Sequence, residues 1–316
     1  MSSPYRLSRQ FLLALLTWMS VGPALAAYSQ LIAFGDSLSD TGNLFKLTSG
    51  FYPGAPYVDG RFSNGKLAVE AMAAELGLHV TSYAVGGAQT GTGNQGGAFL
   101  NGTGVAGQIS NYTKLLDGQG ADPDALYFLW AGPNDFYSGA NIWSASTSSK
   151  ASSNMLGNVM ELYYMGAQNF FVPLMPDLSL TPASLNASSF YQKAAGQRTD
   201  EYNHQLLNGL SNLVARVQGL NVIVFDTSGF MANELPLLRA SGIDTVDACL
   251  NTLSGHVCSA PNTYLFWDGQ HPTTFTNQIL GQAFASAASV PEPRAWLLML
   301  LGLLAMAMWR PARPVH

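Results

Sequence analysis

Short apolar runs alternate with longer amphipathic stretches along most of this 316-residue chain. The short runs lack an alternation of apolar and polar residues, which is typical of strands buried on both faces of a parallel sheet. These predicted strands span residues 30–34, 80–84, 125–130, 169–174 and 221–226. The predicted helices span residues 66–78, 105–116, 149–168, 189–217, 229–240 and 274–287. The intervening segment 138–153 is rich in Ser, Ala and Asn, and we expect it to be a surface excursion.

Five strands separated by helices predict one α/β domain, in which a parallel sheet carries helices on both faces. The body of the chain, about 260 residues, is long enough for one large domain of this kind. In such sheets ligands bind at the edge where the carboxyl ends of the strands meet. We therefore look for reactive side chains directly after the predicted strands.

The first 27 residues have the pattern of a secretory signal peptide. Arg6 and Arg9 precede the apolar run 11–21, and Ala24-Leu25-Ala26 offers a cleavage site of small residues. A membrane anchor is the alternative, and the short apolar run and the cleavage site argue against it. The domain is accordingly expected to span residues 28–289.

In the last 27 residues, 290–316, Val290-Pro291-Glu292-Pro293 is followed by the apolar segment 295–309 and then by arginines. This pattern resembles the PEP-CTERM sorting signal of Gram-negative bacteria. The resemblance implies a transient anchor in the inner membrane and cleavage near Pro-Glu-Pro by an exosortase-like protease. Fifteen apolar residues make about 22 Å of helix, so the segment needs its flanking residues to span a core of about 30 Å. A permanent C-terminal anchor is the alternative.

Composition supports export and argues against several classes of partner. Residues 28–289 hold 9 of the 14 basic and 18 of the 19 acidic residues, a net charge of −9, which disfavours nucleic acid and anionic lipid as electrostatic partners. In an oxidising compartment the two cysteines, Cys249 and Cys258, are expected to pair and brace the following loop; two reduced, buried thiols are the alternative. No zinc-spaced cluster, phosphate-binding loop or calcium loop is present, so no cofactor or metal is expected.

A serine follows the first predicted strand in the segment Gly35-Asp36-Ser37-Leu38. A serine nucleophile needs a base such as histidine, and the histidine needs an acceptor that fixes its tautomer. Of the five histidines, only His271 combines a nearby carboxylate, Asp268, with a predicted helix directly behind it. For Ser37 alone a helix cap is an equally good interpretation. Together, the two segments favour a Ser-His-Asp triad.

Four short blocks follow one another along residues 30–288: Gly35-Asp36-Ser37-Leu38, Tyr83-Ala84-Val85-Gly86-Gly87-Ala88, Gly132-Pro133-Asn134-Asp135 and Asp268-Gly269-Gln270-His271. In type and order they resemble the blocks of GDSL-type esterases and lipases of the SGNH hydrolase superfamily. The resemblance implies a three-layer α/β/α sandwich with an approximately five-stranded, flavodoxin-like parallel sheet. It also implies an oxyanion hole made by the N–H groups of Ser37 and Gly87 and the side-chain amide of Asn134, with Gly86 as the alternative to Gly87. Relatives often carry Asn at the position of Ser82, whose hydroxyl can also form a hydrogen bond.

The expected protein is an exported serine hydrolase that cleaves carboxylic acyl esters through an acyl-enzyme. It is expected in the cell envelope or extracellular matrix, with signal peptidase and an exosortase-like protease as processing partners. The stretch Gly60-Arg61-Phe62-Ser63-Asn64-Gly65 resembles the lecithinase/acyltransferase branch of the family. Lipid esters are therefore slightly favoured over the other substrate classes. The alternatives are a polysaccharide O-deacetylase, a lipid acyltransferase and a non-catalytic matrix protein. Arg61 could bind a substrate group or pair with Asp59.

Aromatic residues are frequent near the four blocks. They could line an acyl or aryl pocket or belong to the core. They are Phe45, Phe51, Tyr52, Tyr57, Phe62, Phe136, Tyr137 and Trp267.

Overall fold

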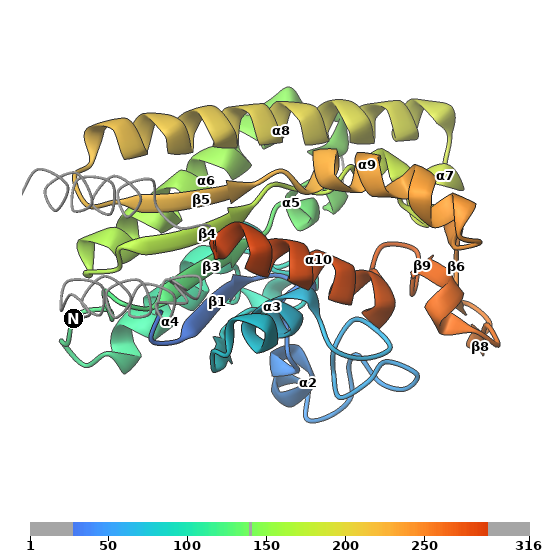
Figure 1. Ribbon diagram of the computed structural model, residues 1–316, viewed down its shortest axis with the longest axis horizontal. Helices are drawn as coiled ribbons and strands as arrows, with labels where there is room; N and C mark the ends of the chain where they lie inside the picture. The colour runs from blue at the N-terminus through green and yellow to red at the C-terminus, as the bar shows by residue number, and fades with distance from the viewer. Residues whose placement is uncertain (1–27, 139–140, 290–316) are drawn as a thin grey trace, which may run out of the picture. The chain divides into compact units, whose positions relative to one another are not determined.

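The predicted strands pair into one parallel sheet with the order β2-β1-β3-β4-β5 (Figure 1). The computed structural model describes residues 28–138 and 141–289 of the chain, and the strands below are those of this part. The strands are β1 (Leu31–Gly35), β2 (Val80–Ser82), β3 (Leu126–Trp130), β4 (Asn169–Pro173) and β5 (Asn221–Phe225). This arrangement confirms the predicted sheet. Each strand lies within one or two residues of its predicted bounds, and the sheet matches the flavodoxin-like order.

The order of the strands places the loops that follow β1 and β3 next to each other at the carboxyl edge of the sheet. β1 pairs with β2 on one side and with β3 on the other, from Leu31 opposite Leu126 to Gly35 opposite Trp130. The chain therefore leaves β1 toward one edge of the sheet and returns to β3 on the opposite side. In open α/β sheets such a change of direction opens a crevice at the carboxyl ends of the two central strands.

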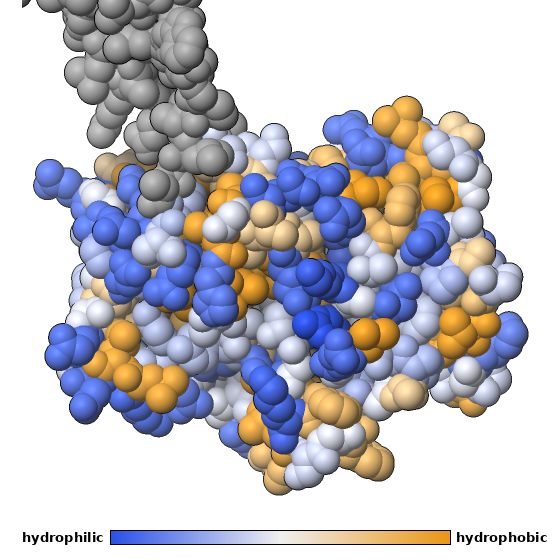
Figure 2. Space-filling model, turned by 60° about the horizontal axis from the view of Figure 1, so that its bottom comes forward, coloured by the Kyte–Doolittle hydropathy of each residue, from blue (hydrophilic) through white to orange (hydrophobic). Residues whose placement is uncertain are grey.

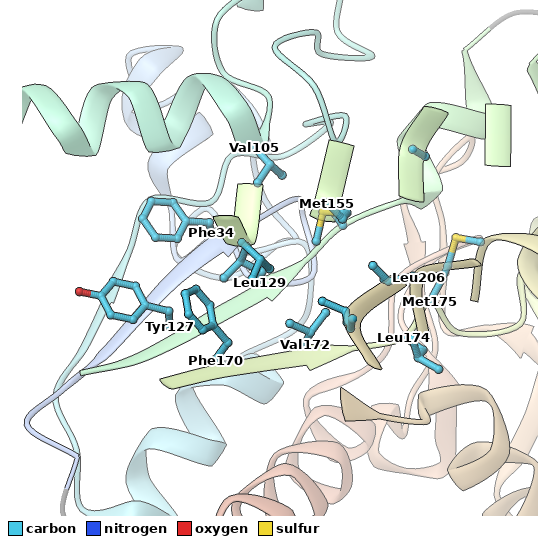
Figure 3. Packing of buried hydrophobic residues seen from close by; sticks show 14 of the residues in the cluster. Phe34, Val105, Tyr127, Leu129, Met155, Phe170, Val172, Leu174, Met175 and Leu206 are labelled. Atoms are coloured by element: carbon cyan, nitrogen blue, oxygen red, sulfur yellow. The ribbon is translucent and has the colours of Figure 1, made fainter. Parts of the chain in front are cut away.

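One face of the sheet is covered by α4 (Val105–Leu115), α6 (Ala145–Tyr164) and α8 (Ser189–Arg216). Alternate strand residues point into this layer, and Figure 3 shows Phe34, Tyr127 and Phe170 packed in it. Phe34 and Phe170 are apolar, and the Tyr127 hydroxyl is hydrogen-bonded. Their burial therefore contributes hydrophobic stabilisation in proportion to the area removed from water.

The opposite face is covered by α3 (Ala68–Leu76) and α10 (Thr274–Ala288), which lie side by side (Figure 1). Phe284 of α10 is fully buried and contacts the rings of Phe128, Trp130, Phe171 and Phe225, with ring centroids 4.8–5.9 Å apart. These two helix layers and the sheet give the three-layer sandwich that was predicted.

The helix predicted to begin at residue 149 begins earlier, because α6 starts at Ala145, inside the segment 138–153 that was predicted to be a surface excursion. Its first turns carry small polar residues that are buried: Ser148 and Ser152 donate hydrogen bonds to Glu201 and Gln205 of α8. The serines therefore allow close packing of two helices while keeping their hydroxyl groups paired. Composition alone suggested a loop, whereas the partner helix makes these positions helical.

The remaining described elements lie mostly in the connections. The short and 3₁₀ helices are α2 (Asn43–Leu47), η1 (Ala98–Leu100), α5 (Pro133–Tyr137), η2 (Asn141–Trp143), η3 (Leu178–Leu180), α7 (Pro182–Leu185) and η4 (Pro261–Thr263). After β5 come α9 (Thr227–Ala240) and two small pairs, β6 (Asp244–Ala248) with β9 (Tyr264–Phe266) and β7 (Leu250–Asn251) with β8 (His256–Val257). The sequence pattern did not predict β6–β9.

Residues Tyr28–Ala288 form one compact unit. Figure 2 turns the lower side of Figure 1 toward the viewer and shows hydrophobic residues in separate patches among hydrophilic ones. Among the described residues, no helix is both long enough and apolar enough to cross a membrane. The apolar segment 295–309, like the predicted signal peptide, lies outside the described residues.

We expect Phe284→Ala to lower the free energy of unfolding by about 3–5 kcal/mol, because it leaves a cavity between α10 and the sheet. Phe190→Ala is the matched control, since Phe190 on α8 is 79% exposed and its loss should change stability by about 0.5 kcal/mol or less. Urea unfolding of both variants measures the difference. A Phe284→Ala protein as stable as the control would contradict this account of the core.

Candidate active site

Ser37 lies on a tight turn directly after β1. The Asp36 carboxylate accepts a hydrogen bond from the Leu38 N–H, and the Asp36 carbonyl accepts one from Ser39. The turn is followed by Asp40, whose buried carboxylate accepts N–H groups from the start of α2. The Asp36 and Asp40 side chains therefore hold the turn, and Ser37 itself is only 8% exposed.

Ser37, His271 and Asp268 are joined by hydrogen bonds. His271 Nε2 lies 2.8 Å from Ser37 Oγ, and His271 Nδ1 lies 2.7 Å from Asp268 Oδ2. The other carboxylate oxygen, Asp268 Oδ1, accepts the backbone N–H groups of Gln270 and His271 at 2.8 Å. With Nδ1 protonated and bound to the carboxylate, Nε2 is left to accept the serine proton. The structure thus brings together three residues from opposite ends of the domain.

The charges around His271 favour its protonated form. Burial opposes this, but the charge of Asp268, the hydrogen bond to it and the charge of Asp36 raise the pKa of His271 above its usual value. Burial alone would raise the pKa of Asp268; the charge of His271 and hydrogen bonds from His271 and Tyr57 instead lower it to about 2. Asp268 is therefore a carboxylate over the whole physiological range, as an acceptor for His271 must be.

Asp36 behaves differently from Asp268. Its Oδ2 atom is buried and has no hydrogen-bond partner among the described residues, and burial raises the pKa of this carboxyl to about 7. Asp36 therefore changes charge near neutral pH, next to Ser37.

Two backbone N–H groups near Ser37 are unpaired. Among the described residues, neither the N–H of Ser37 nor that of Gly87 donates a hydrogen bond, whereas the N–H of Gly86 donates to Asp40 at 2.7 Å. Gly87 has φ +77°, and a Cβ there would lie 2.6 Å from the Asn94 side chain, so only glycine fits. The unpaired N–H favours Gly87 over Gly86 as an oxyanion donor.

Asn134 stands at the start of α5, after β3. One of its amide hydrogens is donated to the Ala88 carbonyl at 3.1 Å, which leaves the other for a ligand. The next residue, Asp135, accepts hydrogen bonds from the Thr90 N–H and hydroxyl group, each at 2.9 Å. These bonds tie the Gly-rich segment after β2 to α5 and hold Asn134 beside Ala88, the residue after Gly87.

Residues 31–284 match the GDSL-like lipase/acylhydrolase family. The chain belongs to this family. It is accordingly a carboxylic ester hydrolase.

Among curated relatives of this GDSL-family hydrolase, a GDSL esterase/lipase of Arabidopsis thaliana is 27% identical over 326 residues, covering 83% of this chain and 92% of the plant protein. The phosphatidylcholine-sterol acyltransferase of Aeromonas hydrophila is 30% identical over 192 residues, covering 60% of this chain and 56% of that protein. A solved structure from the lipolytic G-D-S-L family of Veillonella parvula has 17% identity and a TM-score of 0.45, covering 82% of this chain and 96% of that one.

An apolar cavity of about 160 Å³ opens beside Ser37, Asn134 and His271 in this GDSL-family hydrolase. Its walls come mainly from η3, α7, α9, the β6–β9 pair and α10, together with Trp130 at the end of β3. The apolar side chains of this wall include Trp130, Leu178, Leu185, Met231, Leu235, Val246, Leu265 and Leu280. Met231, Leu235 and Arg239 line it at helical spacing along one face of α9. Most of this wall comes from segments that no sequence block marked.

Most of the aromatic residues near the four blocks do not line this cavity. Of the eight that the sequence suggested, only Tyr137 lines this cavity. Phe62 instead packs against the His271 ring, tilted by 35° with centroids 5.0 Å apart, and Tyr57 contacts Phe62 and Trp267. Phe136 belongs to the core beneath α8. Of the two interpretations that the sequence left open, lining of this cavity holds for Tyr137, while Phe62, Tyr57, Trp267 and Phe136 make packing contacts.

Two structural contacts account for residues that the sequence singled out. Arg61 pairs with Glu70 through two hydrogen bonds of 2.8 and 2.9 Å and with the more exposed Asp59 at 3.4 Å, so its guanidinium is engaged within the protein. Cys249 and Cys258 form a disulfide beside the buried Trp267, which precedes Asp268. Cross-linking this segment limits its freedom in the unfolded chain.

No group of three or more His, Cys, Asp or Glu suited to a metal occurs among the described residues.

Proposed function

We propose that this protein hydrolyses carboxylic esters with an apolar acyl chain, with Ser37 as nucleophile. The observation that carries the proposal is the unbroken set of hydrogen bonds from Ser37 Oγ through His271 to Asp268 at the mouth of the apolar cavity. A hydroxyl bound to the free nitrogen of a histidine is the arrangement that activates serine nucleophiles.

In the first half of the reaction, Ser37 Oγ attacks the acyl carbonyl while its proton passes to His271 Nε2. The carbonyl oxygen becomes negative and is stabilised by the N–H groups of Ser37 and Gly87 and the amide of Asn134. Each such donor typically contributes about 3 kcal/mol to the transition state. His271 then returns the proton to the departing alcohol, which leaves an acyl-enzyme.

In the second half, water replaces the alcohol. His271 takes a proton from water as the oxygen attacks the acyl-enzyme, and the proton passes back to Ser37 Oγ as the acid is released. Asp268 holds the imidazole in one tautomer throughout and stabilises its charged form. Asp268 is ionised at working pH, with a pKa of about 2, which suits this role.

The cavity supports a substrate with several acyl carbons. An apolar cavity of about 150 Å³ holds a six-carbon ring such as benzene, so 160 Å³ beside Ser37 exceeds the need of an acetyl group. This favours lipid or medium-chain esters over the polysaccharide O-deacetylase alternative. Transfer of the acyl group to an alcohol is the second candidate, supported by similarity to an acyltransferase.

Export is part of the proposal. Residues 1–27 act as a signal peptide cut by signal peptidase, and residues 290–316 act as a PEP-CTERM-like tail that holds the protein in the inner membrane until an exosortase-like protease cuts it. The mature enzyme, residues 28–289, then works in the cell envelope or extracellular matrix of a Gram-negative bacterium. The disulfide supports an oxidising compartment.

Replacing the nucleophile should abolish activity. We expect Ser37→Ala to lower kcat/KM for p-nitrophenyl esters by about 10⁴-fold or more, and an organophosphorus reagent to label only the wild-type serine. Ser39→Ala is the control, because the buried Ser39 hydroxyl has no hydrogen-bond partner among the described residues and its loss should leave the rate unchanged. Activity of Ser37→Ala within tenfold of wild type would falsify the proposed role.

Acyl chain length should matter. Each buried methylene contributes about 0.8 kcal/mol, so kcat/KM should be at least about tenfold higher for p-nitrophenyl hexanoate than for the acetate. Leu235→Trp fills the cavity and should lower the ratio of hexanoate to acetate activity. Leu237→Trp should leave that ratio unchanged, because Leu237 lies on the same helix but is 63% exposed. A preference for acetate in the wild type would instead support the deacetylase alternative.

Processing can be checked on the exported protein itself. Intact-mass measurement after expression in a Gram-negative host with a PEP-CTERM system should place the new N-terminus at Tyr28 and the C-terminus near Pro291. A protein that keeps residues 295–309 would indicate the permanent anchor, and retention of residues 1–27 would contradict the signal peptide.

A further inference from the structure

Tyr57 reaches the charged end of the Ser37–His271–Asp268 set from a distant loop. It lies between α2 and α3, 211 residues before Asp268, and its hydroxyl donates to Asp268 Oδ2 at 2.6 Å. The ring is held on two sides, by Trp267 at 6.4 Å and by Phe62 at 5.9 Å between centroids. The hydroxyl is therefore presented by a side chain whose position is set by packing.

The two oxygens of Asp268 have different partners. Oδ1 accepts the two backbone N–H groups of the following turn, and Oδ2 accepts the Tyr57 hydroxyl and lies closest to His271 Nδ1. Besides His271, Tyr57 is the only side chain among the described residues that donates to this carboxylate. Because Asp268 is 5% exposed, water cannot readily replace a lost donor.

We propose that Tyr57 is a positioning residue for the reaction, acting through Asp268, with its hydroxyl setting both the orientation of the carboxylate and the strength of its pull on His271. This inference rests on the proposed function of Ser37, His271 and Asp268. It gives Tyr57 a role that packing against Trp267 would not require.

Charge determines the direction in which loss of the Tyr57 hydroxyl should shift the pKa of His271. The Tyr57 hydroxyl bond stabilises the negative charge of Asp268 and draws part of it away from His271. Without that bond, the carboxylate stabilises the imidazolium more strongly and the pKa of His271 rises further. Since His271 must be neutral to accept the proton of Ser37, the acid limb of the pH profile should move to higher pH.

Other titratable groups face this site and must remain constant in the test. They are Asp36 from the turn after β1, Tyr52 from the same loop as Tyr57, and Tyr137 from α5. The Tyr57→Phe substitution changes none of them and keeps the aromatic ring, so only the donated hydrogen bond is removed.

The test is the pH dependence of kcat and kcat/KM for Tyr57→Phe on a p-nitrophenyl ester. We expect an acid limb at higher pH than in wild type and a fall in kcat of about tenfold, the effect of one lost hydrogen bond to a charged group, with KM little changed. Tyr127→Phe is the matched control: its buried hydroxyl donates to the Asp122 carbonyl at the opposite end of the sheet, and its profile should coincide with that of wild type.

The outcomes separate this inference from the proposed function. An upward shift of the acid limb in Tyr57→Phe alone supports the positioning role. An unchanged limb overturns it, whatever the rate, because a purely structural tyrosine would lower activity without moving the pKa of His271. If Ser37→Ala keeps full activity in the same assay, the proposed function fails first, independently of Tyr57.

Discussion

The buried carboxylate of Asp40 is the contact on which the geometry around Ser37 most depends. It accepts backbone N–H groups from Gly42, Asn43, Leu44 and Gly86, and thereby joins the turn after β1 to the segment after β2. Burial raises the pKa of Asp40, and the four amide hydrogen bonds oppose that rise. A carboxylate bonded in this way compensates for its desolvation with several donors at once. Its effect is to hold Ser37 and Gly87 on neighbouring strand ends.

The buried carboxyl groups of Asp36, Asp40 and Asp268 differ in their hydrogen-bond partners, and Asp268 differs also in the charge of the neighbouring His271. Asp40 and Asp268 each accept several hydrogen bonds, whereas one oxygen of Asp36 has no partner in the part of the chain that the structure describes. Burial therefore leaves Asp36 with a pKa of about 7, while Asp268 stays ionised with a pKa of about 2. The same residue type thus supplies a brace for the turn, a partner for histidine and a group that titrates near neutrality.

Much of the fold and of the site could be predicted because both are encoded in local patterns. Apolar runs without alternation predicted the five strands, and Ser37 was singled out because it follows the end of the first strand. Gly87 and Asn134 were proposed through the resemblance of their blocks to the GDSL family. Ser82, in the place of the more usual Asn, does donate a hydrogen bond, to the Ser39 carbonyl at 2.7 Å. The serine-rich start of α6 was missed because its polarity is matched by Glu201 and Gln205, which lie more than 50 residues away in the chain.

The sequence by itself determined the strands, the order of the four blocks and the residue types available for acyl transfer, since these depend on local periodicity and short motifs. Only the tertiary structure decided which atoms meet. It placed the cavity under α9 and the β6–β9 pair, directed most of the nearby aromatic residues into packing contacts, and brought the Tyr57 hydroxyl to Asp268. The physical reason is that cavities and hydrogen bonds between distant segments arise from how helices and loops pack around the sheet, and that packing depends on the whole chain at once.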